Sequence, residues 1–335
     1  LVVIIVILVA GLGIVVFVNY YKPPEEVTTP EFVTNNVFKL EGTAAFEWLD
    51  PHVSYYMFDY FIMWHSVEML YWYNGSSATQ VIPWLAAEPY TKISDTQYEF
   101  TLREDIQFQD GTPLNSTAVW FSMNRILVMD GTSGDPAEPV HGSQAAWIIQ
   151  QMLDTSLSAY FSGDQDYDEP WVKKVLAQNF IEIVDDYTFR MNIQNPTTQF
   201  DYLISMPWAA IVSPTSVIKK DYEYHNLGTW NGNYTKYFVN MAGIGDTYFN
   251  VPEQGWRIGT GPYYLESVDP DTYDIVLKAY TDYWGGPEDL EYPIVKERMI
   301  PTIEYIYQPA LATRLLDLRA EKVTGVAVAP LDVFS

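Results

Sequence analysis

The side chains best suited to proton transfer or metal binding are scattered along this chain. Its four histidines are His52, His65, His141 and His225, and no two of them stand at the spacing of a zinc-binding motif. No Gly-x-Ser-x-Gly elbow or phosphate-binding loop occurs. Cysteine is absent, which excludes a thiolate metal site and a cysteine nucleophile. We therefore expect no enzyme, no cofactor and no metal site.

One stretch has the alternating carboxylates of a calcium loop. Asp164, Asp166 and Asp168 alternate as the first ligands of such a loop do. However, Glu169 stands where the loop requires glycine, and Val175 stands where it requires glutamate. A solvated acidic loop is the better interpretation.

Three Asn-x-Ser/Thr triplets are candidate modification sites. They begin at Asn74, Asn115 and Asn233 and would allow N-glycosylation if the chain is exported. Triplets of this kind arise easily by chance, so they support export only weakly.

The composition limits both the fold and the partners. The chain has 335 residues, of which 48% are apolar, so it is long enough for two compact domains with a real core. Acidic residues outnumber basic ones 43 to 18, and the formal charge of −25 repels nucleic acid. We therefore expect no nucleic-acid partner. The 26 tyrosines and 11 tryptophans suit either a cleft that grips varied ligands or a β-rich core.

The start of the chain is apolar enough to enter a membrane. Residues 1–18 are an unbroken run of apolar side chains and glycine, which as a helix would measure about 27 Å, close to the hydrocarbon thickness of a bilayer. The tyrosines that follow suit a membrane interface, and a Pro-Pro pair ends the helix. We expect an apolar helix over residues 1–22 and an exposed tether over residues 23–36.

This apolar segment resembles the prepilin-type signals of archaeal binding proteins and pilins, in which the mature protein keeps its apolar stretch. The resemblance implies one of two partners for residues 1–22, namely a membrane or sister subunits in an extracellular filament. Length and apolarity alone do not separate these two partners, and we favour the plain membrane anchor.

Beyond residue 36, expected strands and helices alternate irregularly, which indicates a mixed α/β architecture. Alternating or apolar stretches bounded by turn residues predict strands at 37–40, 98–103, 180–184 and 187–193, of which the last two form a hairpin. Apolar residues at helical spacing predict helices over residues 58–73, 116–129 and 145–157.

Several of these segments resemble the ABC-transporter extracytoplasmic solute-binding proteins of family 5, the oligopeptide/dipeptide-binding type. The longest one covers residues 98–126: a strand that begins Tyr98-Glu-Phe-Thr-Leu-Arg, an Asp-Gly-Thr-Pro turn, and a helix that ends near an arginine. Four further segments match the family in the right order, at residues 49–52, 184–189, 259–286 and 312–323. Together they cover residues 37–335.

The resemblance implies a periplasmic-binding-protein-like fold of type II, of which this chain would form the first lobe. Residues 37–60 and 206–335 would build one subdomain, and residues 61–205 would be an inserted subdomain. The chain stops about where the family crosses into its second lobe, so we expect that lobe to be largely absent. For Gly259, Gly261 and the Asp110-Gly111 turn, we expect a role in folding rather than in ligand binding.

The family's ligand lies between two lobes, which implies where ligand contacts would come from on this chain. The loop after the Leu49-Asp-Pro-His motif should face the cleft, and aromatic side chains elsewhere could stack on a ligand. The candidate ligand-binding residues are His52, Tyr55, Tyr56, Met57, Trp147 and Trp208. For each of them the alternative is an ordinary place in the core.

Two functions remain open at this point. The first is a membrane-tethered extracellular protein that captures peptides or similar oligomeric nutrients for an ABC permease. The second is a structural subunit of a pilus-like cell-surface filament that displays the binding-protein-like domain. The missing lobe favours the second, because half of a clamp binds poorly.

Overall fold

A computed structural model of the chain describes residues 2–10, 13–21, 36–54, 56–75, 77, 79–129, 165–244, 246–288 and 299–327. Side chains are described from residue 36 onward within these ranges, with the exception of residue 167. The expected tether over residues 23–36 and the expected helix over residues 145–157 lie outside the described residues, apart from residue 36 itself.

Two strands are described within the apolar start of the chain, and the helix expected over residues 1–22 stays a prediction. Strands β1 (Val2–Ala10) and β2 (Gly13–Tyr21) pair antiparallel, with Val2 opposite Tyr21. No helix in the described part of the chain is both long and apolar enough to cross a membrane.

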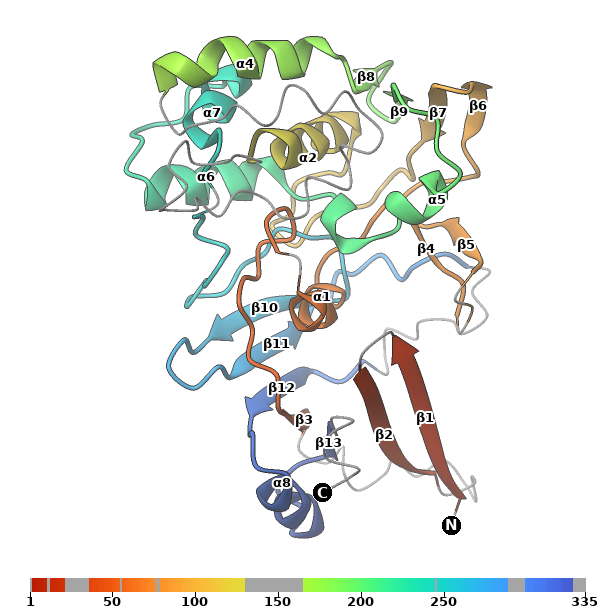
Figure 1. The fold of residues 1–335 in the computed structure, drawn as a ribbon, viewed down its shortest axis with the longest axis vertical. Coiled ribbons are helices and arrows are strands. Elements are labelled where there is room, and N and C mark those ends of the chain that lie inside the picture. Colours follow the sequence, from red (N-terminus) through yellow and green to blue (C-terminus); the bar gives the residue numbers. More distant parts are fainter. Residues whose placement is uncertain are drawn as a thin grey trace.

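The main sheet has five strands in the order β10-β11-β12-β3-β13. They are β3 (Val37–Gly42), β10 (Tyr263–Val268), β11 (Ile275–Ala279), β12 (Thr302–Tyr307) and β13 (Gly325–Val326). The strands β12, β3 and β13 run parallel, and β10 and β11 complete the sheet antiparallel. Helix α1 (Met57–Met63) packs on this sheet through Phe58, whose ring centroid lies 4.6 Å from that of Tyr305 on β12. Helix α8 (Leu311–Arg319) leads into β13 (Figure 1).

A second sheet and a layer of helices form the other part of the molecule (Figure 1). The sheet has the antiparallel order β6-β7-β9-β8, from β6 (Thr91–Ser94), β7 (Gln97–Thr101), β8 (Ile181–Ile183) and β9 (Thr188–Asn192). The helices beside it are α2 (Ser116–Met129), α4 (Gln165–Ala177), α6 (Pro214–Tyr224) and α7 (Tyr234–Met241). Shorter elements connect the two parts: the hairpin of β4 (Tyr71–Tyr73) and β5 (Val81–Pro83), α5 (Phe200–Leu203) and the 3-10 helix η3 (Pro207–Ala209).

Most of the expected elements are confirmed, and one is wrong. The strand after residue 97, the hairpin of β8 and β9, the helix over residues 116–129 and the mixed α/β class all appear. The helix expected over residues 58–73 ends at Met63 instead, and its second half is extended. The extended backbone is needed there because the Ser66 carbonyl accepts bonds from Gly261 and Gln109, and Glu68 pairs with Ile211.

Helix α2 lies at the centre of the helical layer and is buried almost all round. Every residue of this helix except Thr117 and Trp120 is buried. A surface helix would alternate apolar and polar faces, whereas α2 places Ser122, Asn124 and Arg125 inside the protein. Buried polar groups need partners, so Arg125 marks where this layer is joined to the rest of the fold.

Candidate functional site

The predicted ligand loop begins with a turn that Asp50 organises. The backbone oxygen of Asp50 accepts hydrogen bonds from the N–H groups of Val53 (3.1 Å) and Ser54 (2.9 Å). Its side-chain Oδ1 accepts a third from the N–H of His52 (2.9 Å). Aspartate is a common turn former because its side chain can bond its own backbone two residues on. Asp50 therefore holds the turn through both its backbone carbonyl and its side-chain carboxylate.

The exposed part of the loop lies at the start of α1. Tyr56 is 44% exposed and Met57 is 60% exposed, whereas Tyr55 lies outside the described residues. The Tyr56 hydroxyl donates a hydrogen bond to the exposed Glu47, which raises the pKa of the phenol. An aromatic ring beside a flexible thioether offers broad apolar contact to ligands of varied chemistry.

A buried arginine from α2 binds the Asp50 carboxylate behind this loop. Arg125 donates from Nη1 to Oδ1 (2.9 Å) and from Nη2 to Oδ2 (2.7 Å), and the Thr247 hydroxyl also donates to Oδ2 (2.7 Å). Burial alone would raise the pKa of Asp50, but the Arg125 charge and hydrogen bonds outweigh it and lower the pKa to about 2. The loop is therefore joined to α2 by a pair that stays charged at neutral pH.

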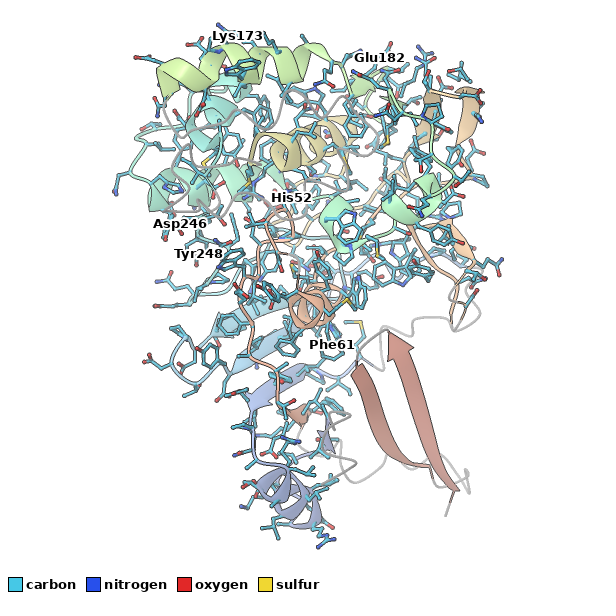
Figure 2. All side chains as sticks on the ribbon, viewed as in Figure 1. His52, Phe61, Lys173, Glu182, Asp246 and Tyr248 are labelled. Atoms are coloured by element: carbon cyan, nitrogen blue, oxygen red, sulfur yellow. The ribbon has the colours of Figure 1, made fainter. Side chains whose placement is uncertain are left out.

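His52, one of the predicted ligand contacts, is fully buried beside this pair. Its Nδ1 accepts from Arg125 (3.1 Å), so Nε2 carries the proton and donates to the Ala210 carbonyl (2.9 Å). Burial, with the nearby Arg125 charge, lowers the pKa of His52 to about 4. Figure 2 shows the imidazole near the centre of the molecule, where it links the turn to the segment after η3.

A second carboxylate shares the same arginine from the other side. Asp221 on α6 lies 3.7 Å from Arg125 Nη2 and accepts a hydrogen bond from Tyr237 on α7 (2.7 Å). Tyr237 in turn accepts one from Arg125 Nε (3.1 Å). Burial raises the pKa of Asp221 to about 6. One arginine thus connects the loop, α2, α6 and α7, on both sides of the boundary expected at residues 205 and 206.

Trp208, another predicted aromatic contact, is not brought to the loop's exposed face. Trp208 is 7% exposed, donates its indole N–H to the Leu203 carbonyl (3.2 Å) and packs edge-to-face on Tyr60. Trp147 lies outside the described residues. Of the six predicted contacts, the structure therefore places two, Tyr56 and Met57, at the surface.

The candidate glycosylation sites differ in their surroundings. Asn233 is exposed, and its Oδ1 caps α7 by accepting from the Lys236 N–H (3.1 Å). Asn115 is half-buried and caps α2 in the same way through the Ala118 N–H (3.0 Å). Asn74 is half-buried in the turn after β4. Asparagine is favoured at helix N-caps, which gives two of the three triplets a local role of their own.

Hollows in the described part of the chain include two that lie away from the ligand loop. A cavity of about 270 Å³ lies between α1 and the main sheet, and another of about 390 Å³ lies between α6 and the segment around Trp230. Neither is lined by His52, Tyr56, Met57 or Trp208. Within the described ranges, no group of three or more histidine or acidic side chains is placed to hold a metal ion.

Glu68 is a buried residue that the sequence did not single out. Its Oε1 accepts hydrogen bonds from Trp84 (2.7 Å) and Tyr283 (2.8 Å), and its Oε2 accepts from Thr260 (2.7 Å) and Trp284 (2.8 Å). Burial raises the pKa of Glu68 against the effect of these donors. Three of the four donors lie 192 to 216 residues away in the sequence, so no local pattern could have revealed the cluster.

Gln109 and Gly259, which lie in segments that resemble the family, hold separate segments of the chain together. The Gln109 amide donates to the carbonyls of Ser66 (2.9 Å), Gly261 (3.1 Å) and Tyr263 (2.7 Å). A Cβ atom at Gly259 would collide with the Ser66 carbonyl oxygen, so glycine is required by close approach. These positions hold the scaffold behind the loop, as their sequence pattern indicated.

The turn at Asp110 is a joint of the same kind. Its carboxylate accepts from the Thr112 N–H (2.9 Å) and from the hydroxyls of Ser213 and Ser216 at the start of α6. The Asp-Gly turn thus connects the segment before α2 to the N-terminus of α6.

Comparison with known proteins gives a family match over most of the chain. Residues 80–333 match the family described as bacterial extracellular solute-binding proteins, family 5 Middle. No curated protein matches the chain.

Solved structures share the fold. OppA of Burkholderia pseudomallei is 17% identical with a TM-score of 0.56, and DppA of Helicobacter pylori, in complex with the peptide STSA, is 20% identical with a TM-score of 0.55. OppA of Haemophilus influenzae, in complex with RPPGFSPFR, is 16% identical with a TM-score of 0.56. Each match covers 86% of this chain and 45% of the other, so the chain spans less than half the length of these structures.

Proposed function

Because the chain belongs to the bacterial extracellular solute-binding proteins of family 5, we propose that it captures peptides or similar oligomeric solutes outside the cytoplasm for an ABC permease. The family is one of binding proteins, not of enzymes. The observation that carries the proposal is the match over residues 80–333, and the peptides named for the similar OppA and DppA structures suggest the class of ligand.

The exposed start of α1 is the place where we propose that the ligand makes contact. Tyr56 and Met57 present apolar surface beside the loop that Asp50 and Arg125 hold in place. Tyr55 belongs to the same loop by sequence and Trp147 is a further proposed contact. His52 and Trp208, which are buried, would act on the ligand only through the loop that they support.

The direct test is calorimetric titration with two peptides, Ser-Thr-Ser-Ala and Arg-Pro-Pro-Gly-Phe-Ser-Pro-Phe-Arg. We expect saturable binding of at least one, and a Kd raised about tenfold by Tyr56→Ala, because that change removes a ring of contact area worth about 1.4 kcal/mol or more. Tyr224→Ala is the matched control, since Tyr224 is 46% exposed and also donates to a carboxylate, that of Asp246. Absence of binding to both peptides, or an equal loss in the two variants, would rule the proposal out.

For attachment, we propose that residues 1–22 hold the protein to a membrane, with assembly into a filament as the second candidate. The unbroken apolar sequence of residues 1–18 supports both. Detergent-phase partition of the chain, with and without residues 1–22, tests the anchor, and negative-stain imaging tests the filament. Particles that remain in the aqueous phase as monomers would contradict both candidates.

Among the three candidate glycosylation sites, we propose that Asn233 is the one modified first in an exporting host. Its exposed side chain supports this order, whereas Asn74 and Asn115 are half-buried. Mass spectrometry of the peptides that contain these residues tests the order.

A further inference from the structure

The loop that carries Tyr56 and Met57 is gathered around one buried carboxylate from α1. Asp59, fully buried, accepts a hydrogen bond at Oδ1 from the backbone N–H of Glu47 (3.0 Å). Its Oδ2 accepts two more, from the backbone N–H of Trp48 (2.9 Å) and from the Ser54 hydroxyl (2.8 Å). These donors lie 12, 11 and 5 residues before Asp59, so one side chain closes the whole loop.

The bonds continue from Asp59 to the exposed rim. The Ser54 hydroxyl oxygen, while its proton is directed at Asp59, accepts from the backbone N–H of Tyr56 (3.3 Å). Tyr60, one residue after Asp59, donates its hydroxyl to the Ser54 carbonyl (2.8 Å). Glu47, whose N–H is bound by Asp59, is also the residue whose side chain bonds the Tyr56 hydroxyl. The backbone and the side chain of Tyr56 are therefore both placed through partners of Asp59.

Asp59 occupies a position where an acidic residue usually serves the helix itself. It is the third residue of α1, where a carboxylate is favoured by the helix dipole and often reaches back to the N-cap N–H. The N-cap residue of α1, Tyr56, makes no side-chain cap hydrogen bond, and the described bonds of Asp59 go to the loop instead. A helix-capping role does not account for this arrangement.

We propose that Asp59 is the positioning residue of the ligand loop: its carboxylate holds residues 47, 48, 54 and 56 in one arrangement and thereby sets the affinity for ligands that contact Tyr56 and Met57. The part about affinity rests on the proposed function, whereas the part about the loop does not. The role needs a carboxylate, because three donors converge on two oxygens, and an amide would replace one of these acceptor oxygens with an NH2 group, which only donates.

The protonation state of Asp59 gives this role a signature. Burial, together with the charge of Glu47, raises the pKa of Asp59 to about 6, and Tyr56 is the other titratable group of the loop that senses the Asp59 charge. The raised pKa means that burial disfavours the charged carboxylate by more than its hydrogen bonds favour it. An open arrangement of the loop that exposed Asp59 to water would return its pKa toward 3.8, so the closed arrangement binds the proton more tightly. Loop order should therefore rise as the pH falls from 7 through 6.

The first arm of the test is amide hydrogen exchange at residues 47 and 48, which needs no ligand. At pH 7 we expect exchange in Asp59→Asn to be about tenfold faster than in the wild type, after correction for intrinsic rates. The wild-type protection should increase between pH 7 and pH 5, and that of Asp59→Asn should stay constant. Glu68→Gln is the matched control, because it removes another buried carboxylate with hydrogen bonds but leaves the loop's partners intact.

The second arm measures the Kd of Ser-Thr-Ser-Ala for the same variants. We expect about a tenfold increase for Asp59→Asn and a change within twofold for Glu68→Gln. If the wild type binds no peptide, the proposed function fails while the exchange arm still decides the role of Asp59 in the loop. Unchanged exchange at residues 47 and 48 in Asp59→Asn would overturn the inference. Faster exchange with an unchanged Kd would overturn the part about affinity.

Discussion

Arg125 binds both carboxylate oxygens of Asp50, and neither side chain has more than 1% of its surface exposed. One partner comes from the start of the ligand loop and the other from α2, a helix that is buried at all but two of its residues. Such a pair gains little against two apolar residues of the same shape, but it is costly to break, because the remaining charge has no water around it. Its value lies in fixing where the loop sits relative to α2.

Breaking this pair should be strongly destabilising, and less so when both partners are changed. We expect Arg125→Met to lower the free energy of unfolding by about 3–5 kcal/mol, because it leaves Asp50 charged and buried. The double change Asp50→Asn with Arg125→Met should cost less than the sum of the single changes. Urea denaturation measures all three. Lys173→Met is the control, since the exposed Lys173–Glu169 pair should contribute about 0.5 kcal/mol or less.

The local sequence predicts more of the scaffold than of the candidate site. Helix α2 and the turn at Asp110 follow from hydrophobic spacing and turn chemistry within about twenty residues, so they could be predicted. The sequence positions of His52 and Trp208 predict that both residues face a ligand cleft. In the structure both side chains are buried, and their hydrogen bonds go to the backbone carbonyls of Ala210 and Leu203.

The roles of Asp59 and Glu68 could not be predicted for a similar reason. Each side chain is an ordinary acidic residue in its own segment. What makes it central is a set of hydrogen-bond donors that the fold brings together, 5 to 12 residues away for Asp59 and up to 216 residues away for Glu68. Neither set of partners leaves a periodic signal in a single sequence.

Replacing Glu68 with glutamine should cost stability and disturb two tryptophans. The amide nitrogen would face the donors that now bind one carboxylate oxygen, either the Trp84 and Tyr283 pair or the Thr260 and Trp284 pair. We expect Glu68→Gln to lower the free energy of unfolding by about 2–4 kcal/mol, since two buried donors are left unpaired. Urea denaturation followed by tryptophan fluorescence measures this. The exposed Glu88 offers the control: Glu88→Gln should change stability by less than about 0.5 kcal/mol, and a similar loss there would refute the explanation.

A methyl group at Gly259 should not be tolerated. The new Cβ would overlap the carbonyl oxygen of Ser66, which belongs to the backbone and cannot rotate away. The backbone at Gly259 and the backbone at Ser66 would therefore have to move apart. We expect Gly259→Ala to lower the free energy of unfolding by about 1–3 kcal/mol. Thermal denaturation measures this loss as a lower midpoint. Gly325→Ala is the matched control on β13, where the closest atom to the added Cβ, Leu40 Cδ1, is 3.5 Å away. Equal effects of the two changes would contradict the close-approach argument.

As the pH falls from 7 to 4, the wild type should gain stability relative to the variant Asp221→Asn. Burial raises its pKa from 3.8 to about 6, so the folded state takes up a proton between pH 6 and pH 4 that the unfolded state does not bind. Uptake by the folded state alone means that this group's contribution to stability rises as the pH falls through that window. Relative to Asp221→Asn, the wild type should gain up to about 3 kcal/mol from pH 7 to pH 4. Urea denaturation at each pH gives the difference, and a flat difference would refute the raised pKa.

His52 should show the opposite slope in nearly the same window. Burial lowers its pKa from 6.5 to about 4, so on acidification the unfolded state binds the proton first. Its contribution is complete above pH 6.5 and is lost as the pH falls towards 4. Against His52→Gln, which keeps a neutral donor and acceptor, the wild type should therefore lose stability from pH 7 to pH 4 by up to about 3 kcal/mol. The same titration by urea denaturation measures both residues. A parallel slope for Asp221 and His52 would show that at least one of them is not buried in the state described here.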